Sequence, residues 1–221
     1  MKNNFHISFD LDGTLINSFP LMKSSWENVN KNLNLKIGWE RYRNNIGLDF
    51  DEICENLDLK NERMRIKKMY FDYNKKNVDK IKLFPGVRGL IHDIEENEIS
   101  WSIITSKPQY TAKDIIDRFE LKPEYMICCD DVSMGKPNKE SSVLLKRFYK
   151  NKKFRDYYYV GDSIADHIFA INSGFKFIQF CNNNNASDQA DEEEDNNINN
   201  SLILNPRPIV NHMSNLLSCL Y

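Results

Sequence analysis

The feature that most constrains the fold is an alternation along the chain of short β-rich runs with segments of helical periodicity. Strands that alternate with helices are typical of an α/β fold with a parallel sheet, whose ligands bind beyond the carboxyl ends of the strands. Helical periodicity between such runs is shown, for example, by Leu90, Ile91 and Ile94, which precede the run at 100–105. Five runs rich in β-branched and aromatic residues predict the strands: FHISF (5–9), SWSIIT (100–105), EYMICC (124–129), DYYYV (156–160) and FKFIQF (175–180).

One long segment, residues 19–82, interrupts this alternation. It contains no run that predicts a strand, whereas Met22, Trp26 and Val29 fit one helix face and Ile66 and Tyr70 fit another. The segment ends at LFPGV (83–87), where proline and glycine indicate a turn. We therefore expect an all-helical insert at 19–82 and an α/β core formed by 1–18 and 83–221, with hinges near 15–19 and 80–84.

The C-terminal part of the chain contains a second irregular segment. Residues 182–200 are low in complexity, rich in asparagine and acidic, so they cannot bury enough apolar surface to offset the entropy cost of ordering. We expect them to form a solvated surface loop within the core. The following SLIL (201–204) predicts an edge strand, and the apolar spacing across 208–220 predicts a closing helix.

Composition excludes several classes of protein. The 221 residues carry a formal net charge of -2, which gives no strong field toward nucleic acid or an anionic membrane. The chain shows no signal peptide and no apolar run of membrane-spanning length, so we expect a cytoplasmic protein. Its cysteines are odd in number and lack metal-site spacing, which predicts reduced and mostly buried thiols. The four histidines likewise share no metal-like spacing and are expected to be structural or on the surface.

Polar residues follow the predicted strands at four places. Each has a purely structural alternative: hydroxyls are common at strand ends, a loop lysine is usually solvated, and Asp or Ser often begins a helix. Together, however, the carboxyl ends of parallel strands would bring them into one crevice. Clustered carboxylates repel one another unless a cation neutralises them, and oxygen ligands suit Mg²⁺. The residues are Asp10 and Asp12 in DLDGT, Thr105 and Ser106 in IITSKP, Lys136 in GKP, and Asp162 and Asp166 in VGDSIAD.

These motifs also carry a family resemblance that spans almost the whole chain. DLDGTLINS, FPGV, IITSKP, CCDDVSMGKPN and YVGDSIADHIFAINSG occur in the order and approximate spacing of the haloacid dehalogenase superfamily. Among its branches, the chain resembles phosphoglycolate-phosphatase-like proteins most. The resemblance implies a Rossmann-like core with a helical cap, in agreement with the insert expected from periodicity. Asn138, where relatives often have proline, and the long Asn-rich segment depart from the family pattern.

The resemblance further implies a phosphatase mechanism and assigns roles to the motif residues. Asp10 would be the nucleophile that forms an aspartyl-phosphate, and Asp12 would be the acid and base. Mg²⁺ would be held by Asp10, the backbone carbonyl of Asp12 and Asp162, with Asp166 as a direct or water-mediated ligand. The phosphoryl oxygens would be bound by Lys136 and by Thr105, which fits the family's second motif better than the other candidate, Ser106.

Three functions remain open on these grounds. The leading one is a Mg²⁺-dependent phosphatase of a small phosphorylated metabolite; Asp12 favours a phosphate ester over the halide substrates of dehalogenases, which resemble this pattern without the second aspartate. A mutase of the β-phosphoglucomutase kind would use the same core, and a catalytically silent binding protein would keep the fold alone. Within the insert, Lys36, Arg41 and Arg43 either contact an anionic substrate or are surface charges. Trp26, Trp39 and Tyr42 either line its inner surface or pack in its core.

Overall fold

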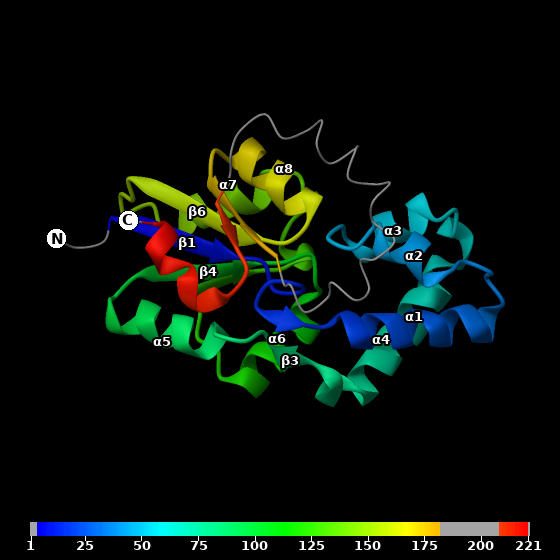
Figure 1. Cartoon of the computed structure of the whole chain (residues 1–221). Coiled ribbons are helices and arrows are strands. Elements are labelled where there is room, and N and C mark those ends of the chain that lie inside the picture. The colour runs from blue at the N-terminus through cyan, green and yellow to red at the C-terminus, as the bar shows by residue number, and fades with distance from the viewer. Residues whose placement is uncertain (1–3, 182–207, 221) are drawn as a thin grey trace.

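The core of the protein is a six-stranded parallel sheet. The computed structural model of the chain describes residues 4–181 and 208–220. The strand order is β5-β4-β1-β6-β7-β8, which places the first strand at the centre (Figure 1). The two neighbours of β1 are in register with it, so that Phe9 lies opposite both Ile103 and Val160 and all three strands end at one edge. The strands are β1 (Phe5–Phe9), β4 (Ser100–Ile104), β5 (Tyr125–Ile127), β6 (Asp156–Gly161), β7 (Lys176–Phe180) and β8 (Ile209–Val210).

Helices cover both faces of this sheet. One face packs on α5 (Val87–Glu96) and α6 (Gln109–Phe119), and the other on α7 (Glu140–Phe148) and α8 (Ile164–Ser173) (Figure 1). Each face has its own apolar cluster, and β1 is buried along its whole length, as the central strand of a doubly covered sheet must be. These observations confirm the predicted α/β class and all five predicted core strands, with ends that differ by at most two residues.

Residues 19–80 are helical and form a separate apolar cluster. The helices are α1 (Phe19–Leu33), α2 (Trp39–Arg43), α3 (Phe50–Asn56) and α4 (Arg63–Lys76), with short 3₁₀ turns at Lys60–Glu62 and Val78–Lys80. Trp26 and Tyr42 are buried in this cluster with their rings stacked at 4.4 Å, and Trp39 packs against Tyr42. Packing inside the insert is therefore the role of these aromatic residues, although Tyr42 also touches the cavity described below.

The two crossings between core and insert lie side by side. They pair as a small antiparallel ladder, β2 (Ile16–Asn17) with β3 (Lys82–Leu83). The sequence did not predict these strands, because two residues are too few to show an alternating pattern, and the expectation of no strand up to residue 82 is wrong at Lys82. The segments expected to act as hinges coincide with this ladder. A division into core and cap domains at these positions stays a prediction.

The C-terminal helix predicted at 208–220 is wrong. The segment instead begins with β8, which pairs with β7, and continues as 3₁₀ turns at Met213–Asn215 and Leu217–Cys219. The ring of His212 accepts a hydrogen bond from the Ser214 backbone N–H and so fixes a turn where the helix was expected to continue. The core buries Val210, Met213 and Leu216. Their apolar spacing, which predicted a helix, is therefore that of a strand followed by 3₁₀ turns. The Asn-rich loop and the SLIL strand lie outside the described residues.

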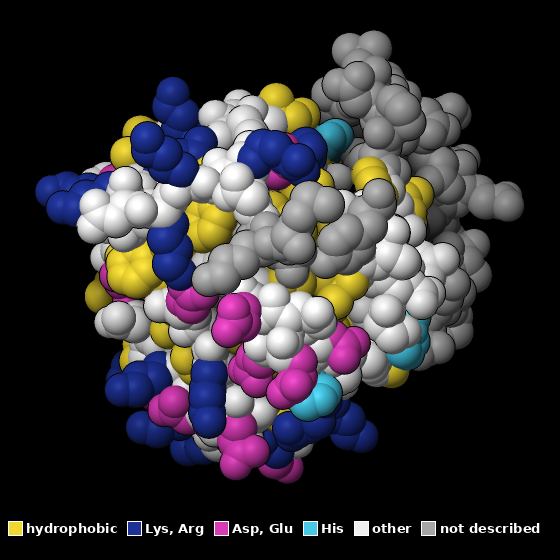
Figure 2. Space-filling view, turned by 90° about the vertical axis from the view of Figure 1, so that its left-hand side faces the viewer, with side chains coloured by type: hydrophobic (Ala, Val, Ile, Leu, Met, Phe, Trp, Pro, Cys, Tyr) yellow, Lys and Arg dark blue, Asp and Glu magenta, His cyan; other side chains and the backbone are white. Residues whose placement is uncertain are grey.

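The surface of the described residues mixes both signs of charge. Lysine and arginine side chains share the end of the molecule away from the insert with aspartate, glutamate and apolar side chains (Figure 2). Within 4–181 and 208–220, none of the helices has the length and apolar character needed to cross a membrane.

His6 is a buried polar residue at the centre of the sheet. Its two ring nitrogens lie 3.1 Å and 2.9 Å from the hydroxyls of Ser100 and Ser102, and the rings of Tyr149 and Phe154 pack against it. Burial, with a smaller contribution from the nearby Lys152 charge, lowers the pKa of His6 from 6.5 to about 3. The histidine is therefore a structural, neutral group, as the sequence predicted.

We expect the neutral state of His6 to make the fold sensitive to acid. Because the folded pKa lies below the unfolded one, the stabilisation is present above pH 6.5 and is lost as the pH falls toward 3. From pH 7 to about 5 this one group should cost about 2 kcal/mol of unfolding free energy, measurable by urea titration. His6→Gln should be less stable at neutral pH but should lose that part of the pH dependence, whereas the exposed His92→Gln should keep it. Identical pH dependence in all three proteins would contradict this role of His6.

Candidate active site

The polar residues predicted to converge do lie around one cavity. It has a volume of about 790 Å³ and is bounded by the loops after β1, β4 and β6 on one side and by the helical insert on the other. The parallel register of the three central strands places these loops at a common edge. Asp10, Asp12, Thr105, Ser106, Lys136 and Asp162 all line the cavity, and Asp166 lies directly behind them.

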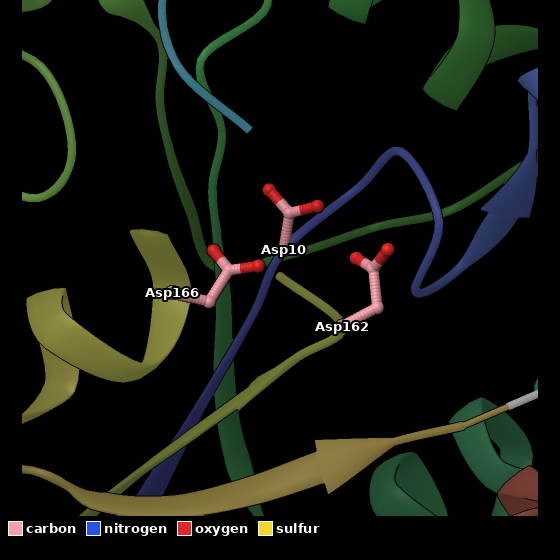
Figure 3. Close-up of side chains that lie close together, drawn as sticks. All are labelled: Asp10, Asp162 and Asp166. Carbon is pink, nitrogen blue, oxygen red and sulfur yellow. The ribbon is translucent and has the colours of Figure 1, made fainter. Parts of the chain in front are cut away.

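Three aspartates form the acidic centre of this site. Asp10 comes from the end of β1, Asp162 from the loop after β6 and Asp166 from α8, and their side chains converge (Figure 3). Each offers an oxygen within 4.8 Å of those of the other two. Burial, aided by the neighbouring carboxylates, raises the pKa of Asp10 to about 7 and that of Asp162 well above its usual value. Such a cluster is stable in its charged form only with cations beside it.

Lys136 supplies one of these cations from the loop before α7. Its side chain is 2% exposed, and its Nζ donates to Oδ1 of Asp10 and to Oδ1 of Asp166, both at 2.6 Å, and to the Tyr159 hydroxyl at 3.1 Å. Burial alone would lower the pKa of Lys136, but attraction to the two carboxylates outweighs it and the net shift is well upward. One lysine against three clustered carboxylates leaves an excess of negative charge that a divalent metal ion would neutralise.

Asp166 belongs both to the cap of α8 and to the acidic centre, whereas the sequence offered a structural role and a metal-binding role as alternatives. Its Oδ2 accepts a hydrogen bond from the Ser163 backbone N–H at 3.0 Å, and its own backbone N–H donates to the Ser163 hydroxyl oxygen at 3.2 Å, which forms a capping box at the start of α8. Its Oδ1 faces Lys136 and Tyr159. The structural reading of this motif is therefore correct for Ser163, whereas Asp166 belongs to both the helix cap and the acidic centre.

The loop after β1 needs glycine to bring its polar groups to Asp162. Gly13 has φ +85°, and a Cβ at this position would collide with the Asp162 carboxylate. The adjacent Thr14 hydroxyl donates to Oδ1 of Asp162 at 3.1 Å. In the sequence DLDGT, the glycine and threonine thus position a carboxylate that lies 148 residues away.

Asp12 lies at the cavity in a different environment from Asp10. Its Oδ2 is 3.0 Å from Nζ of Lys107, and both side chains are largely buried. Its Oδ1 is buried and has no hydrogen-bond partner among residues 4–181 and 208–220. A buried carboxylate oxygen without a donor is costly in a resting protein, and it suits a group that exchanges a proton with a ligand in the cavity.

The two hydroxyls of IITSKP make different contacts. The Thr105 side chain lines the cavity, and its oxygen accepts a hydrogen bond from the Lys107 backbone N–H at 3.2 Å. Ser106 also borders the cavity, but its hydroxyl donates to the backbone carbonyl of Gly47 in the insert at 2.7 Å. This arrangement favours Thr105 as the group that can donate to a ligand.

The three basic residues of the insert, whose roles the sequence left open, differ in their exposure and in their position relative to the cavity. Lys36 is exposed and lies outside the cavity, and Arg41, which is 58% exposed, pairs with Asp58 on the surface. Arg43 is only 25% exposed and lines the cavity wall opposite the acidic centre. Of the three, Arg43 is therefore the one placed to meet an anionic part of a ligand.

Sequence reasoning missed three residues of this site. Lys107 lies within a motif that had been singled out, and its position between two hydroxyls and a proline was a usable signal. Tyr159, whose hydroxyl contacts Lys136 and Asp166, looked like an ordinary residue of a buried strand. Gly47 carried no local signal, because its contact with Ser106 depends on how the insert sits on the core.

Comparison with known proteins identifies the family. The haloacid dehalogenase-like hydrolase family matches residues 7–180, which is most of the chain. The chain belongs to this family. The predicted superfamily, and with it the hydrolase class, is confirmed.

Individual relatives agree with this assignment. The chain is 26% identical over 146 residues to a phosphorylated carbohydrates phosphatase of Thermotoga maritima, an alignment that covers 63% of this chain and 68% of that protein. It is 32% identical over 87 residues to an N-acetylmuramic acid 6-phosphate phosphatase of Pseudomonas putida, covering 38% of this chain and 39% of the relative. Part of each relative thus lies outside the alignment.

Solved structures show the same fold over the whole chain. A predicted phosphoglycolate phosphatase from Haemophilus somnus aligns with a TM-score of 0.75 at 20% identity, covering 100% of this chain and 99% of that one. A hydrolase from Pseudomonas syringae aligns with a TM-score of 0.78 at 19% identity, covering 98% and 97%.

Removing the Lys136 charge should destabilise the folded protein strongly. Lys136→Met leaves Asp10 and Asp166 buried without their shared cation, and breaking a buried ion pair in this way costs about 3–5 kcal/mol. Urea unfolding at neutral pH measures the loss. Lys139→Met, at an exposed position of the same loop, is the matched control and should change stability by less than about 0.5 kcal/mol. Equal stability of the two variants would show that Lys136 does not hold the acidic centre together.

Proposed function

We propose that the protein is a Mg²⁺-dependent phosphatase that hydrolyses a small phosphorylated metabolite through an aspartyl-phosphate on Asp10. The main support for the proposal is the contrast between the environments of Asp10 and Asp12, two carboxylates on one loop. Asp10 is buried beside Lys136 and two further aspartates, whereas Asp12 faces the same cavity with a buried, unpartnered oxygen. Two carboxylates in contrasting environments are what a nucleophile and an acid–base pair require.

The names of the relatives support a phosphate ester as substrate. The Thermotoga protein is a phosphatase of phosphorylated carbohydrates and the Pseudomonas protein a phosphatase of a sugar 6-phosphate. A third relative, from Saccharomyces cerevisiae and 25% identical over 142 residues, is a glycerol-1-phosphate phosphohydrolase. Small phosphorylated alcohols and sugars are common to all three, and we extend that substrate class to this chain.

The acidic centre fits a divalent metal ion. It offers only oxygen donors, it carries more negative charge than Lys136 neutralises, and burial raises the pKa of two of its members. We propose that Asp10, Asp162, the backbone carbonyl of Asp12 and, directly or through water, Asp166 hold Mg²⁺. When bound, the ion would neutralise charge between the carboxylates and the phosphoryl oxygens.

The first step uses Asp10 and Asp12 together. Lys136 fixes Oδ1 of Asp10, so that Oδ2 can attack phosphorus while the bond to the leaving oxygen breaks. Asp12 donates its proton to that oxygen and releases the alcohol. Thr105 and Lys136 would bind the phosphoryl oxygens and hold the group in line for attack.

The second step reverses the role of Asp12. As a carboxylate, it takes a proton from a water molecule, whose oxygen attacks the phosphoryl group on Asp10. The bond between phosphorus and Asp10 breaks, inorganic phosphate leaves, and both aspartates return to their initial states. The helical insert covers the cavity opposite these residues, and Arg43 on its wall would contact a carboxylate or other anionic group carried by the alcohol part of the substrate.

Phosphate release from a panel of esters tests this function. We expect Mg²⁺-dependent release from one or more sugar or short-chain alcohol phosphates, and none after removal of the metal with a chelator. Asp10→Asn should abolish release, with a loss of more than about 10⁴-fold, because the nucleophile is gone. Asp12→Asn should lower it strongly and most for esters with poor leaving groups.

Asp93→Asn, at an exposed position of α5, is the control and should behave as wild type. If the product is an isomerised sugar phosphate and not free phosphate, the protein is a mutase and not a phosphatase. Release that persists in Asp10→Asn would exclude Asp10 as the nucleophile.

A further inference from the structure

The loop of residues 44–49, between α2 and α3, is one of the parts of the insert that line the cavity. Four of its residues line the cavity, and its Gly47 carbonyl accepts the hydrogen bond from the Ser106 hydroxyl at 2.7 Å. Ser106 directly follows Thr105 at the end of β4. A side chain of the core therefore holds the backbone of the insert at the point where a ligand would be covered.

The other side of Gly47 lies against the loop after β6. Its φ of +107° favours glycine, and a Cβ there would be 2.8 Å from the Ser163 hydroxyl and 3.5 Å from the Ala165 side chain. Ser163 is the residue that caps α8 together with Asp166. Gly47 is thus wedged between the loop that carries Thr105 and the loop that carries Asp162.

We propose that Ser106 is a positioning residue, a latch whose hydroxyl holds the Gly47 loop closed over the site. Because the hydroxyl hydrogen is donated to Gly47 in the closed arrangement, it cannot also be donated to a phosphoryl oxygen. Opening breaks this one neutral hydrogen bond, and glycine at 47 permits the close fit when the loop returns. The effect on turnover rests on the proposed function, whereas the latch itself does not.

The direct test is the state of the Gly47 loop in the ligand-free protein. The Leu48 amide adjoins the Gly47 carbonyl, so its ¹⁵N and ¹H shifts and relaxation dispersion report whether the hydrogen bond is made. Ser106→Ala should raise the ratio of open to closed loop about threefold to tenfold, which is the free energy of one such hydrogen bond expressed as an equilibrium ratio. Ser106→Thr keeps a hydroxyl and should stay close to wild type.

Two further variants locate the effect. Ser24→Ala removes a serine hydrogen bond to a carbonyl inside α1, and it should leave the Leu48 amide unchanged. Gly47→Ala should open the loop by steric conflict with Ser163, and the double variant should open little further than the larger single one, because a Gly47 backbone pushed away from Ser163 also loses its hydrogen bond to Ser106. If the opening caused by the two single changes adds fully in the double variant, Ser106 and Gly47 do not act on the same loop movement, and the latch is contradicted.

Kinetics separate a latch from direct phosphate binding. With any ester that the wild type hydrolyses, Ser106→Ala should raise KM, at most by the factor by which it raises the open-to-closed ratio, while kcat changes by less than about twofold. A large loss of kcat with an unchanged Leu48 amide would overturn the latch and restore Ser106 as a phosphate-binding residue. If no ester is hydrolysed, the proposed function fails, but the response of Leu48 to Ser106→Ala still decides the latch.

Discussion

The structure of the site depends on a cluster of three carboxylates, of which the two that pair with Lys136 are buried. Asp10, Asp162 and Asp166 lie within 4.8 Å of one another, and Lys136 neutralises only part of their charge. Burying like charges is unfavourable, so the fold must supply compensation from elsewhere. It does so with Tyr159, Thr14, the capping contacts of Ser163 and a sheet whose register brings three strand ends together. The remaining negative charge is the reason why the site should attract a divalent cation, and the cation with Lys136 would offset the repulsion between the carboxylates and a phosphoryl group.

Much of the core could be predicted because its signals are local. The five core strands are runs of β-branched and aromatic residues, and the rule that ligands bind beyond parallel strand ends was enough to bring Asp10, Thr105, Lys136 and Asp162 into one place. The short strands β2, β3 and β8 were missed because two residues show no periodicity. The C-terminal helix was wrong because the apolar spacing of Val210, Met213 and Leu216 fits a strand followed by 3₁₀ turns as well as it fits a helix.

The contacts that the sequence could not reveal are those that depend on tertiary placement. Lys107 beside Asp12, Tyr159 beside Lys136 and Gly47 beneath Ser106 each join segments far apart in the chain. The same limit applies to the basic residues of the insert, where only the structure separates Arg43 from Arg41 and Lys36. Residue type and spacing thus define the chemistry of the core, whereas the fit of the insert over the core defines what the cavity admits.

The central claim is that Asp10 becomes phosphorylated during turnover. The most direct measurement mixes the protein with its best substrate and Mg²⁺, quenches with acid within the first turnover, and locates the bound phosphoryl group by peptide mass spectrometry. Asp12→Asn with an ester of a good leaving group should accumulate the intermediate, since the base for its hydrolysis is absent. The peptide that contains Asp10 should gain the mass of one phosphoryl group, and Asp10→Asn should not. Rapid release of phosphate without a labelled peptide, or a label on another residue, would contradict the mechanism.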